Sequence, residues 1–242
     1  MKKFSFIFDR SKKAKILKKN ILKNYRNWPI KRSNIIIVGG GDGFMLKTIK
    51  NLYKFNKPFY GINCGSIGFL LNRYLSKKIS QRVNKAKITT IYPLQIKTVS
   101  RGKKRSSFLA INELSLLRQS KQTALLKLKI NKKILIKKLI GDGVLLSTPA
   151  GSTAYNLSVH GPILSLNSKK LAITPISPFR PRRWKGKIVS DKTKIYISNI
   201  DSKKRPIAAV ADNNEIRDIA KVKIVTNKRI KCKLLFNSKE SL

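Results

Sequence analysis

The chain has 242 residues, with 55 Lys and Arg against only 10 Asp and Glu, and its formal net charge is +45. A hydrophobic fraction of 41% is ordinary for a globular protein and excludes a disordered polycation. Two cysteines and one histidine argue against a disulfide scaffold and a zinc site, and no apolar run approaches the roughly 20 residues of a membrane span. We therefore expect a cytoplasmic globular protein with no membrane partner.

The positive charge is spread along the whole chain in short runs, such as Lys132 with Lys133 and Arg182 with Arg183. So much charge attracts any polyanion. A dedicated nucleic-acid surface more often gathers its cations on one face, with aromatic residues between them. A compositional drift that covers every solvated face explains the pattern more simply, so we expect nucleic acid to bind at most nonspecifically.

The first third of the chain alternates between strand-like and helix-like segments. The predicted strands are 4–8, 34–38 and 58–62, and the predicted helices are 12–25 and 44–55. Apolar strands that alternate with helices predict a parallel sheet covered on both faces. Ligands bind such sheets at the carboxyl ends of the strands, where the glycine-containing segments 39–43 and 63–68 both fall.

After residue 87 the pattern changes to short strand-like runs separated by polar turns. The predicted strands are 88–99, 107–111, 114–117, 125–130, 134–140, 144–147, 187–189, 194–197, 207–211 and 222–226, and the proline-rich stretch 174–181 is predicted to be a loop. This pattern is typical of an all-β sandwich. We therefore predict domains at 1–87 and 88–226 with a site in the cleft between them, and a short tail at 227–242 that returns toward the first domain.

The turn at 39–43 reads Gly-Gly-Gly-Asp-Gly and joins a predicted strand to a predicted helix. Such a turn exposes backbone N–H groups near a helix N-terminus and is suited to hold phosphate. A carboxylate there would repel phosphate unless it has a chemical task, such as accepting a proton from an attacking hydroxyl. The turn lacks the Gly-Lys-Ser/Thr of a Walker A loop and the third glycine of a dinucleotide fingerprint. A simple tight turn remains an equal alternative for Asp42 alone.

A second motif covers residues 141–162 and begins with Gly-Asp142-Gly. A predicted strand leads through Thr148 and Pro149 into a Gly-Ser-Thr turn and a short helix that ends at Ser158. Small residues let a flat ligand approach the backbone, hydroxyls offer hydrogen bonds, and Tyr155 offers a stacking face. These groups suit an adenine and its ribose, although a helix cap with a core tyrosine explains the segment equally well.

Taken in order, these motifs resemble those of the NAD kinase family, and the resemblance covers almost the whole chain. It is carried by Gly40-Gly41-Asp42-Gly43, by 61–70, by Asn112-Glu113 and by 142–162. The resemblance implies a Rossmann-like α/β domain followed by a β-sandwich-type domain, in a homodimer or homotetramer. It also implies transfer of a terminal phosphoryl group from ATP or polyphosphate to the 2′-hydroxyl of the adenosine ribose of NAD.

The same resemblance implies roles for individual residues. Asp42 corresponds to the proton acceptor. Contacts to NAD or to the donor are implied for Gly40, Gly41, Gly43, Lys47, Asn63, Asn112, Glu113, Asp142, Ala150, Thr153, Ala154, Tyr155, Asn156, Leu157, Ser158 and Asn214. Mg²⁺ is the expected divalent cation, carried chiefly by the donor phosphates rather than by protein ligands.

The chain departs from the family pattern at several positions. Phe44 stands where a threonine is common, Ile140 where a polar or basic residue occurs, and His160 where a glycine is usual. His160 is expected to pack beside the nucleotide segment. Three alternatives stay open: a sugar or lipid kinase that shares the glycine turn, a basic nucleic-acid-binding protein without turnover, and a degenerate inactive kinase.

Overall fold

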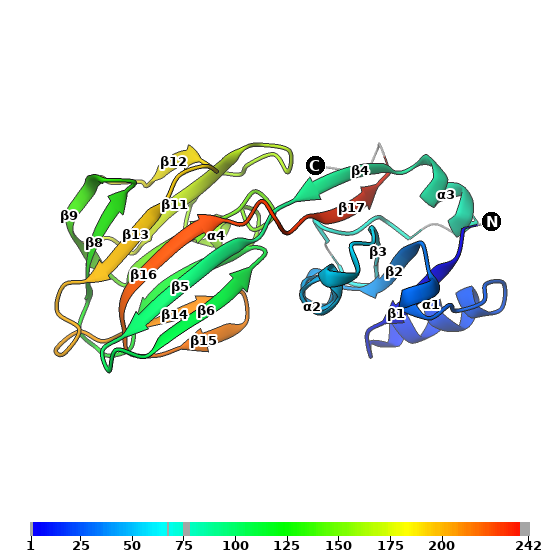
Figure 1. Ribbon diagram of the computed structural model, residues 1–242, viewed down its shortest axis with the longest axis horizontal. Helices are drawn as coiled ribbons and strands as arrows, with labels where there is room; N and C mark the ends of the chain where they lie inside the picture. The colour runs from blue at the N-terminus through cyan, green and yellow to red at the C-terminus, as the bar shows by residue number, and fades with distance from the viewer. Residues whose placement is uncertain (1, 67, 75–77, 238–242) are drawn as a thin grey trace. The chain divides into compact units, whose positions relative to one another are not determined.

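The computed structural model describes residues 2–66, 68–74 and 78–237. They form two compact units, one made of the residues up to Ile91 together with those from Arg229 onward, and the other of Tyr92–Lys228 (Figure 1). Ile67 of the predicted glycine-containing segment and residues 238–242 of the predicted tail lie outside the described residues. Each unit has its own β-sheet or β-sheets and its own hydrophobic cluster.

Within the described residues, the first unit is built on a five-stranded sheet in the order β1-β2-β3-β17-β4. Its strands are β1 (Phe4–Phe8), β2 (Ile35–Gly40), β3 (Phe59–Asn63), β4 (Lys87–Ile91) and β17 (Cys232–Phe236). Its helices are α1 (Lys12–Leu22), α2 (Asp42–Leu52) and α3 (Ile79–Lys85), with 3₁₀ turns η1 (Ile30–Arg32) and η2 (Tyr53–Phe55). The first three strands run parallel, so their carboxyl ends lie along one edge of the sheet.

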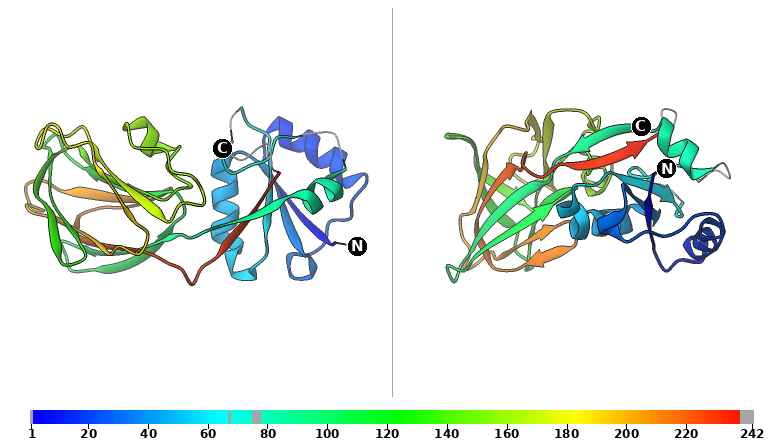
Figure 2. Two further views of the ribbon diagram at one scale, coloured as in Figure 1. Left: turned by 90° about the horizontal axis from the view of Figure 1, so that it is seen from above. Right: turned by 45° about the vertical axis from the view of Figure 1, so that its right-hand side comes forward.

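Apolar side chains cover both faces of this sheet, as the continuous apolar strands predict. On one face, Ile35 and Ile37 of β2 share a cluster with Leu17 of α1 and with residues of α3. The alternate side chains of β2, Ile36 and Val38, are also fully buried, and α2 packs against β2 and β3. Figure 2 shows the three helices around the strands of this Rossmann-like unit.

The structure corrects two boundaries at the ends of predicted helices. α2 begins at Asp42 rather than near Phe44, because Gly41 takes the N-cap position with φ −98° and ψ 175°. Asp42 therefore lies in the first helical turn, where the helix dipole favours a negative charge. α1 ends at Leu22, three residues before the predicted end.

The strand predicted over 88–99 is two strands that belong to different units. β4 pairs with β17 in the first unit, whereas β5 (Leu94–Ser100) pairs with β6 and β16 in the second. Pro93 separates them and has no N–H to continue a ladder. Strand β17, near the end of the chain, pairs in parallel with β3.

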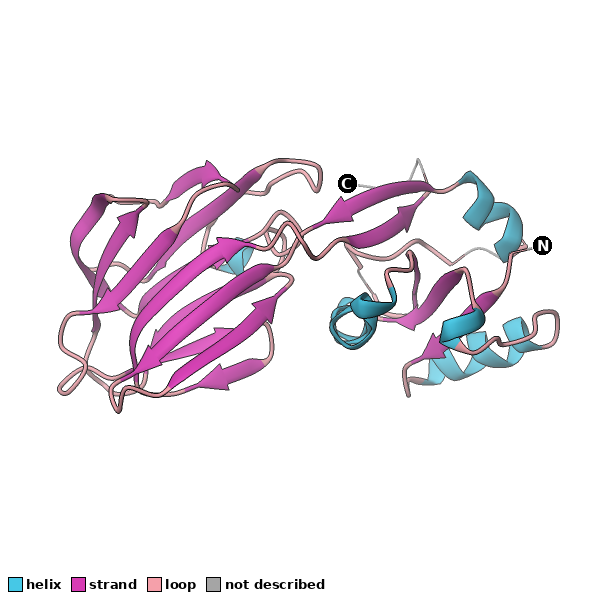
Figure 3. Ribbon diagram, in the orientation of Figure 1, coloured by secondary structure: helices cyan, strands magenta, loops and turns pink. Residues whose placement is uncertain are grey.

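The second unit, 92–228, is described without a gap and consists of two six-stranded sheets. One has the order β6-β5-β16-β13-β8-β9 and the other the order β12-β11-β10-β7-β14-β15. The remaining strands are β6 (Arg105–Ala110), β7 (Glu113–Arg118), β8 (Ala124–Ile130), β9 (Lys133–Gly141), β10 (Gly143–Ser147), β11 (Lys170–Ile176), β12 (Lys187–Ser190), β13 (Ile195–Asn199), β14 (Ile207–Ala211), β15 (Asn214–Ile216) and β16 (Ile219–Thr226). Helix α4 (Tyr155–Ser158) is the short helical element within 92–228, and Figure 3 shows how strongly strands dominate this unit.

One hydrophobic cluster joins the two sheets and confirms the predicted sandwich. It includes Leu94 and Ile96 from one sheet and Leu114, Leu116 and Leu146 from the other, all fully buried. Antiparallel sheets that share a core in this way form a β-sandwich.

The loop predicted at 174–181 is wrong in its first part, because Thr174–Ile176 completes strand β11. Pro175 lies in this strand opposite Val144 of β10. It is tolerated because β12 pairs only with 170–173, so the neighbouring ladder has already ended at the proline. Among the described residues, no helix is both long enough and apolar enough to cross a membrane.

Candidate active site

The glycine turn lies at the carboxyl edge of the parallel strands and combines two kinds of glycine. A side chain at Gly40 would lie 2.8 Å from Phe44 Cδ1 and 2.9 Å from Asp9 Oδ2, so packing requires this glycine. A Cβ at Gly41 or Gly43 would meet nothing within 4 Å. The turn is therefore packed on its strand side and open at the start of α2.

Asp42 stands at this open position, with its carboxylate fixed by a distant segment of the chain. Its Oδ2 accepts a hydrogen bond from Phe69 N at 2.8 Å, and its Oδ1 accepts one from Leu70 N at 3.0 Å. A carboxylate oxygen has two lone pairs, so each oxygen retains one acceptor position. The half-buried carboxylate is thus held in one orientation and can still accept a proton from a ligand hydroxyl.

The loops after β2 and β3 are joined to each other at the same edge. Cys64 N donates to Gly40 O at 2.9 Å, and Asn63 Oδ1 accepts from Gly65 N at 2.8 Å. Asn63 therefore shapes its own loop. Lys47 is exposed one turn beyond Gly43 on α2.

Sequence reasoning missed the contribution of strand β1 to this edge. Asp9 follows β1, donates its N–H to Gly39 O at 2.9 Å and accepts from Ser11 N at 2.8 Å. A hollow of about 300 Å³ between α1 and the end of β3 is lined in part by Lys13 and Cys64. Burial, with the nearby Asp9 carboxylate, raises the pKa of the Cys64 thiol, and Lys13 lowers it in part. Cys64 is therefore a poor nucleophile.

In the second unit, Asn112 and Glu113 are held by Asp212, a residue that sequence reasoning did not select. Asp212 accepts backbone hydrogen bonds from Ile111, Asn112 and Glu113 at 2.9, 2.9 and 3.2 Å. It occupies the turn between β14 and β15 with φ 51°. An aspartate beside asparagines in a strand–strand turn is the sequence signal that could have identified it.

Asn112 carries an unusual polar atom. The residue is 8% exposed, and its Oδ1 has no hydrogen-bond partner among the described residues. Buried polar atoms are nearly always paired in native proteins, so an unpaired one calls for an explanation such as a ligand contact.

The segment that begins at Thr148 packs directly on Asn112, so the structure brings two of the predicted motifs together. Thr148 N donates to Asn112 O at 2.8 Å, and Thr148 Oγ1 donates to Ile111 O at 2.7 Å. A side chain at Gly151 would lie 2.4 Å from Asn112 O. The small residues of this motif allow a close approach between two backbone segments of the protein itself.

The predicted adenosine-binding residues divide into exposed and enclosed groups. Tyr155, Leu157 and Ser158 are exposed, Thr153 and Ala154 are half-buried, and Ala150 is buried. Asn156 is fully buried: its Nδ2 donates to Pro162 O at 2.9 Å and to Ser152 O at 3.3 Å, and its Oδ1 accepts from Thr174 Oγ1 at 2.7 Å. This network makes Asn156 part of the scaffold that shapes the segment.

His160 adopts φ 60°, a left-handed conformation that glycine takes without strain. The resemblance places a glycine at this position, and the backbone explains that preference. His160 is exposed at the end of the turn after α4.

Asp142 lies apart from the other predicted residues of its unit. In the β7/β10 ladder, Ser147 pairs with Glu113 at one end and Gly143 pairs with Leu117 at the other. Four residues of strand separate these ends by about 13 Å. The structure therefore places Asp142 and Asn112 at opposite ends of one ladder in the same chain.

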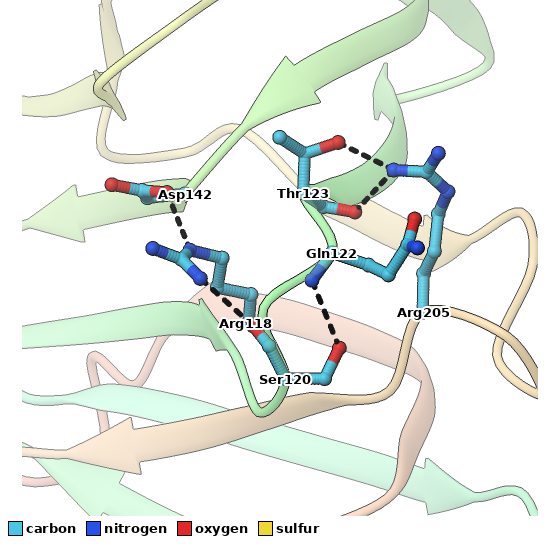
Figure 4. A network of polar contacts seen from close by, with 6 residues as sticks. All are labelled: Arg118, Ser120, Gln122, Thr123, Asp142 and Arg205. Atoms are coloured by element: carbon cyan, nitrogen blue, oxygen red, sulfur yellow. Dashed lines mark hydrogen bonds and ion pairs between the residues drawn. The ribbon is translucent and has the colours of Figure 1, made fainter.

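Arg118 fixes Asp142 at its end of the ladder (Figure 4). Arg118 Nε lies 2.5 Å from Asp142 Oδ1, and Arg118 Nη1 donates to Ser120 O at 2.8 Å. Both side chains are more than one-third exposed, and exposed ion pairs stabilise proteins by only about 0–1 kcal/mol. The pair therefore orients the carboxylate more than it stabilises the fold.

The predicted site residue Asn214, by contrast, begins β15 two residues after Asp212 and is exposed near the Asn112 end of the sheet.

Comparisons with known proteins show which family the chain resembles. Residues 111–231 match the family model described as the ATP-NAD kinase C-terminal domain. The chain is 43% identical to an NAD kinase of Zymomonas mobilis over 242 residues, which cover 99% of this chain and 94% of the relative. It is also 43% identical to an NAD kinase of Caulobacter vibrioides over 210 residues, which cover 87% of this chain and 81% of the relative.

Two solved structures share the fold. One is an NAD kinase from Archaeoglobus fulgidus in complex with ATP, with a TM-score of 0.77, 21% identity, and coverage of 98% of this chain and 94% of that one. The other is a yeast NADH kinase in complex with NADH, with a TM-score of 0.80, 20% identity, and coverage of 100% of this chain and 85% of that one. At such identities the likeness establishes the architecture of the two units.

Proposed function

This chain belongs to the NAD kinase family and phosphorylates NAD, and we propose that Asp42 accepts the proton of the 2′-hydroxyl during the reaction. The observation that carries the proposal is the placement of the Asp42 carboxylate. Backbone N–H groups of Phe69 and Leu70 hold it beside two glycines that leave the space in front of α2 open.

The 2′-oxygen of the adenosine ribose forms a bond to the terminal phosphorus of the donor while its proton passes to Asp42. The bond from that phosphorus to the bridging oxygen breaks, and the shortened donor leaves with the electron pair. Such transfers depend on positioning and charge neutralisation more than on covalent chemistry.

We assign the adenosine side of NAD to the second unit. The unpaired Oδ1 of Asn112 supplies an acceptor for a ligand donor, and Tyr155 presents an exposed ring. Glu113, Thr153 and Ser158 add polar groups nearby in the chain. Asn156 supports this surface from beneath and is not proposed to touch NAD.

The donor is assigned to the glycine turn, with Lys47 as the nearby cation on α2. ATP is the first choice as donor, and polyphosphate is the alternative that the resemblance implies. We assign Mg²⁺ to the donor phosphates, because hard oxygen ligands suit this ion and catalytic Mg²⁺ commonly arrives bound to substrate phosphates. When bound, it would neutralise phosphate charge.

We further propose that the protein works as a homo-oligomer and that Asp142 serves the NAD site of a second copy. Asp142 lies opposite Arg118, six residues or about 20 Å along strand β7 from Asn112, so it is poorly placed to share a ligand with Asn112 of its own chain. A second copy would give the oriented carboxylate a ribose to bind. The two free cysteines fit a reducing cytoplasmic location for this assembly.

The alternatives receive less support. A sugar or lipid kinase would share the glycine turn, but it would not need the 148–161 segment packed on Asn112. A panel of NAD, sugars and lipids with ATP would separate these activities. Turnover of NAD would also set this protein apart from a nucleic-acid-binding protein without activity and from an inactive kinase.

The decisive experiment replaces Asp42 with Asn and measures NADP formation from NAD. Loss of a general base usually costs about 10²- to 10⁴-fold in turnover, so we expect a decrease in that range with NAD binding largely retained. Asn keeps one oxygen to accept a backbone N–H, which limits the structural damage.

Asp201→Asn is the matched control, because Asp201 also accepts a backbone hydrogen bond, from Lys204 N at 3.1 Å, but lies in a surface turn of the second unit. We expect it to retain full turnover. Undiminished turnover in Asp42→Asn, with the same unfolding temperature as the unmodified protein, would remove Asp42 from the proposed role.

A further inference from the structure

The outer face of one sheet of the sandwich carries cations in register across neighbouring strands. One cross-strand row reads Ser107, Lys97, Lys223, Tyr196 and Lys129. The next row reads Arg105, Val99, Lys221, Ser198 and Lys127. We name this surface the basic groove, because all of these residues except Lys127 line a hollow of about 790 Å³.

The groove has no acidic residue to balance its charge. The six strands of this sheet, all of them described, contain no aspartate or glutamate. The structure gives no ion pair to Lys97, Arg105, Lys129, Lys221 or Lys223 among the described residues. The acids of this unit lie in turns or in the other sheet, as Asp191, Asp201 and Glu215 illustrate.

Because of this register, the charge destabilises the sheet when no ligand is bound. Lys97 and Lys223 are direct partners on adjacent strands. Like charges directly opposite each other destabilise a sheet. An anion in the groove would relieve this repulsion, whereas the general basic drift of the sequence predicts no particular register.

Tyr196 indicates what kind of anion fits. Its half-buried ring lies between Lys223 and Lys129 in the first row, with Lys223 Nζ 5.7 Å from the ring centroid and Lys129 opposite it on β8. An aromatic ring between cations can stack a nucleobase while the cations bind phosphates. We propose that the basic groove binds single-stranded nucleic acid.

The size of the groove agrees with a short strand. Five neighbouring strands at about 4.8 Å spacing span roughly 19 Å, which accommodates a few nucleotides. A second copy of the chain is a poor occupant, because a symmetric contact would bring two equally basic rows together. The proposal uses none of the residues assigned to NAD phosphorylation and holds independently of that activity.

The test measures fluorescence anisotropy of a labelled oligouridylate of about 12 nucleotides, a length within the range of known single-strand sites. The groove variant carries Lys97→Thr, Lys129→Thr, Lys221→Thr and Lys223→Thr, because threonine suits exposed strand positions. The matched control removes the same charge from exposed positions of α1 through Lys12→Gln, Lys15→Gln, Lys18→Gln and Lys19→Gln. Thermal unfolding and NADP formation verify that each variant is folded.

We expect the groove variant to lose far more affinity than the α1 control. Affinity falls with salt with a slope of about −0.7 per phosphate contact on a log–log plot, so the loss of four contacts should reduce the steepness of this slope by about 3. Tyr196→Leu keeps the charge and should weaken binding about tenfold through lost stacking, whereas Tyr196→Phe should bind normally. These single substitutions keep the proposal testable if the fourfold variant does not fold.

Three outcomes would overturn the proposal. Equal losses in the groove variant and the α1 control would mean diffuse attraction to the whole surface. Competition by polyphosphate as effective per phosphate as the oligonucleotide, with no effect of Tyr196→Leu, would mean a site for phosphate chains. No measurable binding by the unmodified protein would remove the site altogether.

Discussion

The glycine turn after β2 and the segment from Thr148 to Gly161 both combine small residues with polar ones, yet they differ in how their polar groups are used. At the turn, Gly41 and Gly43 face open space and the Asp42 carboxylate keeps acceptor capacity. In the segment, Gly151 lies against the backbone of Asn112, and Asn156 is fully hydrogen-bonded inside the protein.

This difference separates residues that bind a ligand from residues that build the surface for it. A buried polar group with all its partners in place stabilises the scaffold, whereas an open glycine or an unpaired buried oxygen leaves a position for a ligand. The family resemblance alone assigns both kinds to binding.

Asn156→Ala should give the largest loss of stability at neutral pH. It removes three buried hydrogen bonds worth about 1 kcal/mol each, so we expect a loss of about 3 kcal/mol. For a chain of this size, this corresponds to a decrease of roughly 6–12 °C in unfolding temperature, measured by circular dichroism. Ser158→Ala is the matched control on the same helix, and its unfolding temperature should not change. Equal stability of the two variants would break the distinction between scaffold and ligand-facing residues.

Asn112→Ala should affect binding more than stability. Its Oδ1 has no partner among the described residues, so removing the side chain breaks no hydrogen bond of this atom. We therefore expect the free energy of unfolding to fall by no more than about 1 kcal/mol. If Oδ1 binds NAD, the KM for NAD should rise about tenfold, because a missing hydrogen bond to a ligand costs about this much. An unchanged KM together with a large loss of stability would identify Asn112 as scaffold.

Gly43→Ala should stabilise the protein while impairing catalysis. Gly43 lies in the first turn of α2 in open space, and replacing a helical glycine with alanine gains about 0.5–1 kcal/mol at most. The added methyl group would occupy the space assigned to substrate, so NADP formation should fall. Urea unfolding and steady-state kinetics measure the two effects, with Gly102→Ala as a control in a hairpin turn. A stabilised variant with normal activity would show that the open space is not used.

Cys232→Ala should change how the free energy of unfolding depends on pH, and only above about pH 9. Burial raises the pKa of the Cys232 thiol from 9.0 to about 12, so the thiol favours folding fully below pH 9 and this contribution is lost as pH rises toward 12. Above pH 9 the unmodified protein should lose up to about 1.4 kcal/mol per pH unit more than Cys232→Ala. Urea unfolding from neutral pH to about pH 10 measures this difference, and parallel pH profiles would contradict it.

The sequence by itself determined the elements with a strong local pattern. The apolar runs of β1, β2 and β3 and most strands of the sandwich were predicted close to their observed bounds, because burial imposes a periodicity on each strand. Strands β11 and β15 were not predicted. The glycine turn was placed correctly at the carboxyl edge for the same reason. The ordered motifs also sufficed to indicate the family.

Only the tertiary structure decided which partner each residue has. Strand pairing split 88–99 between two units and admitted Pro175 to a strand where the neighbouring ladder had ended. Long-range hydrogen bonds connect the backbone N–H groups of Phe69 and Leu70 to the Asp42 carboxylate. They also connect the backbone N–H of Asn112 to the Asp212 carboxylate. Register put Asp142 at the far end of the β7/β10 ladder and aligned the lysines of the basic groove. A contact between residues far apart in the chain leaves no local periodicity, so these features follow from the fold and not from the order of the residues.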